Sequence, residues 1–173
     1  IVNVTANAQA DQSVTQGSGS YTANSASTST KLPLPLRETP QSVTVVTREK
    51  MDDFNQTNIN QVLDSTVGVN VERIETDRTY YTSRGFDITN FQVDGQGMPM
   101  PNGNVPGDID TAIYDHIEVV RGANGLMTGA GNPSATVNMV RKRPTRDFQA
   151  EVKGSGGSWQ NGRAEADISG SMV

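Results

Sequence analysis

The chain has no cysteine among its 173 residues. This excludes disulfide frameworks, thiolate metal sites and cysteine nucleophiles, and it fits an envelope protein. Long apolar stretches are missing too, since no run approaches the roughly 18 residues that a membrane-spanning helix needs. No signal segment is recognisable at the N-terminus, so an exported protein would be represented here by its processed chain or a fragment.

Apolar and basic residues are scarce. Hydrophobic residues make up 34% of the chain and aromatic residues 5%, and the 17 glycines bring the apolar share only to the low end of the usual range. A core is therefore possible but small, as in a free soluble domain or a domain lodged in a water-lined cavity. The net charge of −5 argues against nucleic acid as a partner, because nucleic acid requires a basic face.

Residues 117–145 form the most informative segment. Short β-prone runs lie at 117–120 and 137–140, and glycines stand between them at 122, 125, 129 and 131. Glycine at this density lets the backbone pass where side chains cannot, usually in tight turns. The pattern predicts a strand, a glycine-rich turn and a second strand.

The N-terminal region divides into a tip and a linker. Residues 1–6 alternate apolar and polar side chains, which predicts a short strand. Residues 7–31 are mostly Gln, Ser, Thr, Gly, Asn and Ala with little to bury, which predicts a flexible tether. Order is expected to begin near residue 32, where prolines impose extended backbone.

The rest of the chain predicts an α+β fold with a small mixed sheet of about four strands, short helices and long loops. Thr47 and Asn58 are suitable caps for two helices. The expected elements are a strand at 42–47, helices at 48–55 and 59–64, strands at 69–71 and 91–95, one helical turn at 112–115, and a final hairpin over 148–156 and 163–173.

Five blocks of this sequence resemble the plug domain of TonB-dependent outer-membrane receptors, in the order and at the spacing of that family. They are residues 37–49, 60–71, 83–86, 93–95 and 117–145. Residues 126–134 and 141–144 are most similar to ferric-siderophore receptors of the ferric-pyoverdine or coprogen type. The resemblance implies a plug domain at 32–147, followed at 148–173 by the first hairpin of a barrel of about 22 strands that is otherwise absent from this chain.

The resemblance implies a plug that occludes the barrel in the outer membrane, helps bind a ferric siderophore, and couples to TonB for active iron uptake. Residues 1–6 are similar to the TonB box, which would lie in the periplasm and pair as a strand with the C-terminal domain of TonB. The implied TonB contacts are Ile1, Val2, Asn3, Val4, Thr5 and Ala6.

Loops at 77–90 and 96–108 are expected to face outward. The implied siderophore contacts are Tyr80, Tyr81, Arg84, Met98, Met100, Pro101 and Asn102, and the implied contacts with the barrel wall are Arg84, Arg121, Arg141 and Arg143. The siderophore itself would carry the iron, so no protein metal ligand or cofactor is expected. Each arginine could equally be a solvated surface charge, and the tyrosines and methionines could be core or lid residues.

Catalysis has little support. The single histidine, His116, follows Asp115 but has no thiol to activate, and a surface histidine is expected. Ser83 and Ser134 lack a Gly-x-Ser-x-Gly context, and the glycine-rich turn lacks the Gly-Lys-Ser/Thr of a phosphate-binding loop. The alternative function is a free-standing periplasmic or extracellular protein-binding domain, against which the final hairpin would fold.

Overall fold

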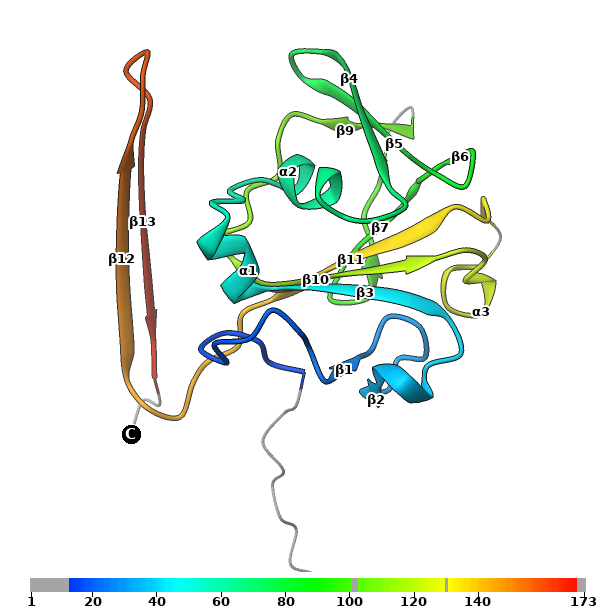
Figure 1. Ribbon diagram of the computed structural model, residues 1–173, viewed down its shortest axis with the longest axis horizontal. Coiled ribbons are helices and arrows are strands. Elements are labelled where there is room, and N and C mark those ends of the chain that lie inside the picture. The colour runs from blue at the N-terminus through cyan, green and yellow to red at the C-terminus, as the bar shows by residue number, and fades with distance from the viewer. Residues whose placement is uncertain (1–12, 101–102, 130, 171–173) are drawn as a thin grey trace, which may run out of the picture. The chain divides into compact units, whose positions relative to one another are not determined.

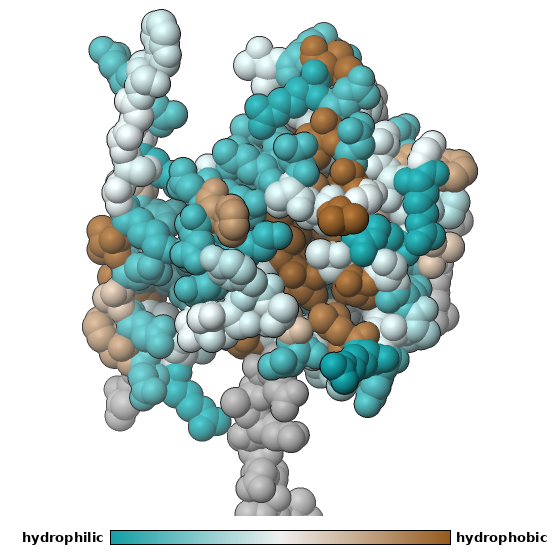
Figure 2. Space-filling view, in the orientation of Figure 1, coloured by the Kyte–Doolittle hydropathy of each residue, from teal (hydrophilic) through white to brown (hydrophobic). Residues whose placement is uncertain are grey.

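The structure is a computed structural model that describes residues 13–100, 103–129 and 131–170. The chain divides into two compact units, with the boundary between Arg141 and Lys142 (Figure 1). Among the described residues, no helix has the length and apolar character needed to cross a membrane. The visible surface is mostly hydrophilic, with hydrophobic side chains gathered toward the middle of the first unit (Figure 2).

A five-stranded mixed sheet organises the first unit, in the order β3-β10-β11-β7-β8. The pairing of β7 with β11 is parallel and the other pairings are antiparallel. The strands are β3 (Ser42–Thr47), β7 (Asn90–Val93), β8 (Gln96–Gly97), β10 (Tyr114–Arg121) and β11 (Ala135–Arg141). Since β10 is buried along nearly its whole length, both faces of the sheet are covered.

Short helices follow the predicted caps. The Thr47 hydroxyl accepts a hydrogen bond from the backbone N–H of Lys50, and α1 (Arg48–Asp53) begins there. Asn58 and Gln61 form a capping box at α2 (Ile59–Asp64). Both predicted helices are confirmed. The remaining helical segments are η1 (Leu36–Glu38) and α3 (Gly125–Thr128).

The helical turn predicted at 112–115 is wrong. Tyr114 and Asp115 already belong to β10, and the turn before them is closed by the Asp110 carboxylate, which accepts the backbone N–H of Ala112. Pairing with the neighbouring strands supplies this segment with more backbone hydrogen bonds than a single helical turn could offer.

A second sheet and α2 cover one face of the central sheet. The second sheet contains β4 (Asn70–Glu75), β5 (Arg78–Ser83), β6 (Phe86–Asp87) and β9 (Val105–Pro106), with β9 paired to β5. Tyr81 of β5 and Phe91 of β7 meet with ring centroids 5.1 Å apart. The core also includes Val62 and Leu63 from α2 and Ile117 and Val119 from β10.

The opposite face is covered by the N-terminal segment, where β1 (Ser25–Ala26) pairs with β2 (Leu34–Pro35). Thr15, Ser25, Ala26 and Thr28 are buried, so the predicted flexible tether does not hold for residues 13–31. The reason is that backbone N–H groups of this segment find buried carboxylates on β10. The first part of the predicted tether, residues 7–12, lies outside the described residues.

The second unit is an antiparallel hairpin of β12 (Gln149–Gly156) and β13 (Gly162–Ser169), which confirms the predicted pairing of these two strands. Its place in a barrel stays a prediction. Its register pairs apolar with apolar residues on one face, as in Val152 with Ala166. Lys153 and Glu165 are paired on the other face. One face is therefore apolar and the other carries ion pairs.

Candidate functional site

Two arginines lie close together where β5 and β10 end. Arg84 and Gly85 form the turn between β5 and β6, both with positive φ (56° and 82°), as a two-residue hairpin turn requires. A Cβ at Gly122 would lie 2.8 Å from a terminal nitrogen of Arg84, and one at Gly68 would lie 3.1 Å from Cδ of Arg121. Each arginine side chain therefore lies against a glycine, and the absence of a side chain there makes room for it.

The pair has a surplus of positive charge. Among the described residues, the Arg121 guanidinium donates only to neutral oxygens, at 2.7 Å to Thr44 Oγ1, 2.9 Å to Ser42 Oγ and 2.9 Å to the Val67 carbonyl. Burial and then the charge of Arg84 lower the pKa of Arg121. Within residues 13–100, 103–129 and 131–170, neither guanidinium pairs with a carboxylate. The arrangement can accept an anion or a carboxylate from outside these residues.

The other two predicted barrel contacts differ from this pair. Arg141 already forms an ion pair with Asp94, whose carboxylate also accepts the Arg141 backbone N–H at 2.9 Å. Asp94 sits in the turn between β7 and β8 and has positive φ together with Gly95, which confirms the predicted Asp-Gly turn. Arg143 is exposed and belongs to the second unit.

The two tyrosines that were predicted to contact the siderophore, Tyr80 and Tyr81, lie on opposite faces of β5, because neighbouring side chains of a strand point to opposite sides. Tyr81 is 1% exposed, its hydroxyl donates to Asn60, and burial raises its pKa. Asn60 in turn donates to Asp108. Tyr81 is therefore a core residue in this structure. Tyr80 is half-buried, and its hydroxyl accepts from Asn104 at 3.3 Å.

Met98 and Met100 are half-buried against the core, while Arg84 is exposed. The predicted contacts Pro101 and Asn102, and the predicted TonB contacts at residues 1–6, lie outside the described residues. Of the predicted siderophore contacts, Arg84 is therefore exposed and Tyr80, Met98 and Met100 are partly accessible. Their contact with a siderophore stays a prediction.

The expectation of a surface histidine is wrong. His116 is 1% exposed, with Nδ1 2.6 Å from Asp115 Oδ2 and Nε2 3.1 Å from Glu118 Oε1. Burial alone would lower the pKa of His116, but hydrogen bonds and charges from Asp115 and Glu118 outweigh it and raise the pKa to about 9. No group of three metal-ligating side chains is arranged to hold a metal among the described residues. The hydrogen bonds and the raised pKa make His116 a buried cation between two carboxylates.

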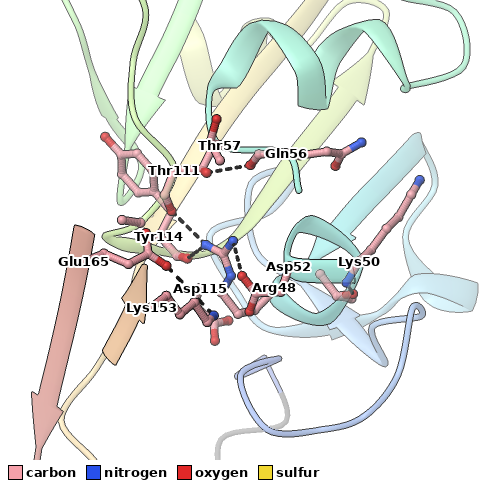
Figure 3. A network of polar contacts seen from close by, with 12 residues as sticks. Arg48, Lys50, Asp52, Gln56, Thr57, Thr111, Tyr114, Asp115, Lys153 and Glu165 are labelled. Atoms are coloured by element: carbon pink, nitrogen blue, oxygen red, sulfur yellow. Dashed lines mark hydrogen bonds and ion pairs between the residues drawn. The ribbon is translucent and has the colours of Figure 1, made fainter. Parts of the chain in front are cut away.

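A second buried cation joins α1 to the loop before β10 (Figure 3). Nη1 of Arg48 donates to the carbonyl oxygens of Thr111 at 2.8 Å and Tyr114 at 3.1 Å, and Nη2 lies 2.8 Å from Asp52 Oδ1. The Thr111 hydroxyl donates at 2.7 Å to the carbonyl of Gln56, which follows α1. The Arg48 side chain therefore joins α1 to the segment that leads into β10, and Thr111 links that segment to Gln56. Nothing in the sequence context of Arg48 predicted this role.

Known proteins resemble this chain over most of its length. The TonB-dependent Receptor Plug Domain family matches residues 35–136. The Ferripyoverdine receptor of Pseudomonas aeruginosa is 48% identical over 165 residues, which is 92% of this chain and 20% of that protein. The Ferric-pyoverdine 358 receptor of Pseudomonas putida is also 48% identical, with the same two coverages. The chain spans about a fifth of the length of these curated relatives.

The solved structures that resemble this chain are also outer-membrane receptors. The outer-membrane ferripyoverdine receptor of Pseudomonas aeruginosa, bound to ferripyoverdine, matches with a TM-score of 0.88 and 48% identity over 93% of this chain and 22% of that one. The alcaligin receptor FauA of Bordetella pertussis matches with a TM-score of 0.81 and 49% identity, over 90% of this chain and 27% of that one. These relatives are receptors, and they support the plug interpretation over a free-standing binding domain. This chain belongs to the TonB-dependent receptor plug domain family.

Proposed function

We propose that this chain is the plug of an outer-membrane receptor that takes up a ferric siderophore and is driven by TonB. The plug occludes the barrel, contributes its outward loops to ligand binding, and offers residues 1–6 to the C-terminal domain of TonB. The observation that carries the proposal is the 48% identity to a ferripyoverdine receptor over 92% of the chain. The role is one of binding and gating, without catalysis, and the iron arrives inside its siderophore.

The proposed ligand is a ferric siderophore as a class, and no individual siderophore is assigned. Relatives of equal similarity are named for different ligands, ferripyoverdine in one case and alcaligin in another. The identity of the siderophore therefore depends on surfaces beyond this chain, foremost the barrel and its loops.

The unpaired arginines support a docked plug. Arg84 and Arg121 place two like charges side by side without a carboxylate partner in the described part of the chain. Such a pair is stabilised when carboxylates or an anionic ligand approach it, because each charge-assisted hydrogen bond contributes about 1.5–3 kcal/mol. Arg121 is held by neutral oxygens and faces the barrel wall in this proposal, while the more exposed Arg84 reaches the wall and the siderophore.

Arg84→Ala in the complete receptor is expected to weaken binding of the ferric siderophore by roughly tenfold or more, from the loss of one charge-assisted contact. The measurement is a binding isotherm on purified receptor. The matched control is Arg37→Ala, since Arg37 is exposed on η1 and has no hydrogen bond or ion pair in the described part of the chain. Arg48 would be unsuitable as a control, because it is buried. Equal affinities for the two variants would count against a ligand role for Arg84.

Val4→Pro is expected to abolish capture of the chain by the C-terminal domain of TonB. Proline removes a backbone donor from the predicted strand at residues 1–6, and strand pairing depends on such donors. A pulldown measures the loss. Ala10→Pro makes the same change outside the predicted strand and should leave capture intact. Retained capture by the Val4→Pro protein would refute the strand-pairing proposal.

A further inference from the structure

The N-terminal layer, defined here as residues 13–35, covers a sheet face that carries ionisable groups. Residues 13–30 contain no charged side chain. Beneath this layer lie Asp115, His116 and Glu118, which are 3%, 1% and 0% exposed. Buried charges persist only where partners satisfy them, so the contacts of these three residues explain why the layer is attached.

A β-bulge brings the three side chains together. Neighbouring residues of a regular strand point to opposite faces, yet Asp115 and His116 are in contact. The register of β10 against β11 shifts between Tyr114 and His116, which turns Asp115 toward the face that carries His116 and Glu118. The bulge thus places one cation between two carboxylates.

Each carboxylate accepts backbone hydrogen bonds from a different part of the N-terminal layer. Asp115 accepts the N–H groups of Thr15 at 2.9 Å and Gln16 at 2.7 Å. Glu118 accepts the N–H groups of two further residues of the layer, Ser27 at 3.1 Å and Thr28 at 2.7 Å.

His116 is the cation of this cluster. The strands beside it, β3 and β11, carry no charged side chain before Arg141. The nearby cations and the tyrosine of the layer have other partners, since Arg48 pairs with Asp52, Arg141 pairs with Asp94, and the Tyr21 hydroxyl donates to Asp53. With His116 protonated the cluster holds one net negative charge, and without the proton it holds two.

The layer is separable from the core. The hydrophobic core lies on the opposite face of the central sheet and includes no residue of 13–35. Ala26 is the one buried hydrophobic residue among the described residues of the layer. Detaching the layer therefore breaks its hydrogen bonds to the sheet and uncovers Val120, but it leaves the core on the opposite face packed.

We propose that Asp115, His116 and Glu118 form a pH-sensitive clasp that holds the N-terminal layer on the sheet, and that loss of the His116 proton releases the layer while the core stays folded. A neutral imidazole has a single N–H and serves only one carboxylate. The two carboxylates then repel each other in a poorly solvated site. The clasp concerns attachment of the layer, so it goes beyond the proposed receptor function and would stand if the ligand proposal failed.

The direction of the pH effect follows from the pKa shifts of Asp115, His116 and Glu118. The pKa of His116 is raised from 6.5 to about 9, so its contribution is complete below pH 6.5 and is lost as the pH rises toward 9. Burial raises the pKa of Asp115 and Glu118, but their hydrogen bonds and the His116 charge lower it overall, so their contribution is lost only under acid conditions, below their ordinary values. Attachment is therefore strongest at mildly acidic pH.

Amide hydrogen exchange of the 173-residue chain tests the clasp, with rates corrected for the intrinsic effect of pH. Protection of the four amides at Thr15, Gln16, Ser27 and Thr28 is expected to fall on the order of tenfold between about pH 6 and about pH 8. Protection of core amides, such as those of β11, is expected to stay constant over the same interval. The wild-type titration requires no substitution, so it tests the proposal even if a variant fails to fold.

His116→Gln is expected to lower protection of the four amides at about pH 6 and to abolish its dependence on pH up to about pH 8. Asn138→Ala is the control that alters no charge: it removes the 2.8 Å hydrogen bond to the Thr28 hydroxyl, together with the 2.9 Å hydrogen bond that Asn138 Oδ1 accepts from the Gly95 N–H. That variant should loosen the layer and keep the pH dependence. The proposal is overturned if the His116→Gln protein retains the wild-type pH dependence, or if the four amides open only together with the core.

Discussion

Replacing Phe91 with alanine is expected to lower the free energy of unfolding by about 3–5 kcal/mol. Phe91 is 1% exposed and its ring packs at a tilt against Tyr81, so the substitution leaves a cavity between β7 of the central sheet and β5 of the second sheet. Both strands lead into the turns that carry Arg84 and Asp94. The measurement is urea unfolding of the 173-residue chain, followed by circular dichroism.

Phe86→Ala is the matched control. Phe86 lies on β6, in the same fold region, but it is 48% exposed. Its truncation removes little packing and should cost less than about 1 kcal/mol. Similar losses for the two variants would mean that the packing of β5 against β7 is not the main source of stability for this unit.

Replacing Arg48 with alanine is expected to lower the free energy of unfolding by about 3 kcal/mol. Removing one partner of a buried pair costs about 3–5 kcal/mol, and the lower end applies because the Asp52 side chain is 32% exposed. The same change leaves the carbonyl oxygens of Thr111 and Tyr114 without their donor. Urea unfolding again gives the difference, with Arg37→Ala as the exposed control.

A further variant separates charge from packing. Arg48→Met keeps the apolar stem and loses all donors, so it should be nearly as destabilised as Arg48→Ala. If Arg48→Met were as stable as the wild-type chain, the hydrogen bonds to Thr111 and Tyr114 would contribute little, and the stem alone would explain the burial of Arg48.

The parts of the fold that depend on neighbouring residues were predictable from the sequence. Thr47 and Asn58 cap the helices that follow them, because a cap acts within three residues along the chain. The Asp94-Gly95 turn is local in the same sense. The resemblance to the plug family, in turn, rests on blocks whose order and spacing can be read directly.

The predictions that were wrong concern parts of the fold that depend on contacts between residues far apart in the sequence. Thr15 bonds to Asp115, 100 residues away, and Thr28 bonds to Glu118, 90 residues away. Composition describes residues 13–31 as a linker because their side chains have little to bury, but their backbone N–H groups are what attaches them. The burial of His116 follows from the same contacts, and a β-bulge at Asp115 leaves no local signature in the sequence.

The chemistry of the N-terminal layer has a consequence for what happens after it detaches. The layer is rich in hydroxyl and amide groups, and the face beneath it carries the polar residues Thr47, His116, Glu118 and Asn138 together with the apolar Val120. Once the two surfaces part, water can hydrate the polar groups, so the apolar surface that is exposed is interrupted by polar side chains. An interrupted apolar surface limits association with other molecules, so a displaced layer remains able to return to its place on the sheet.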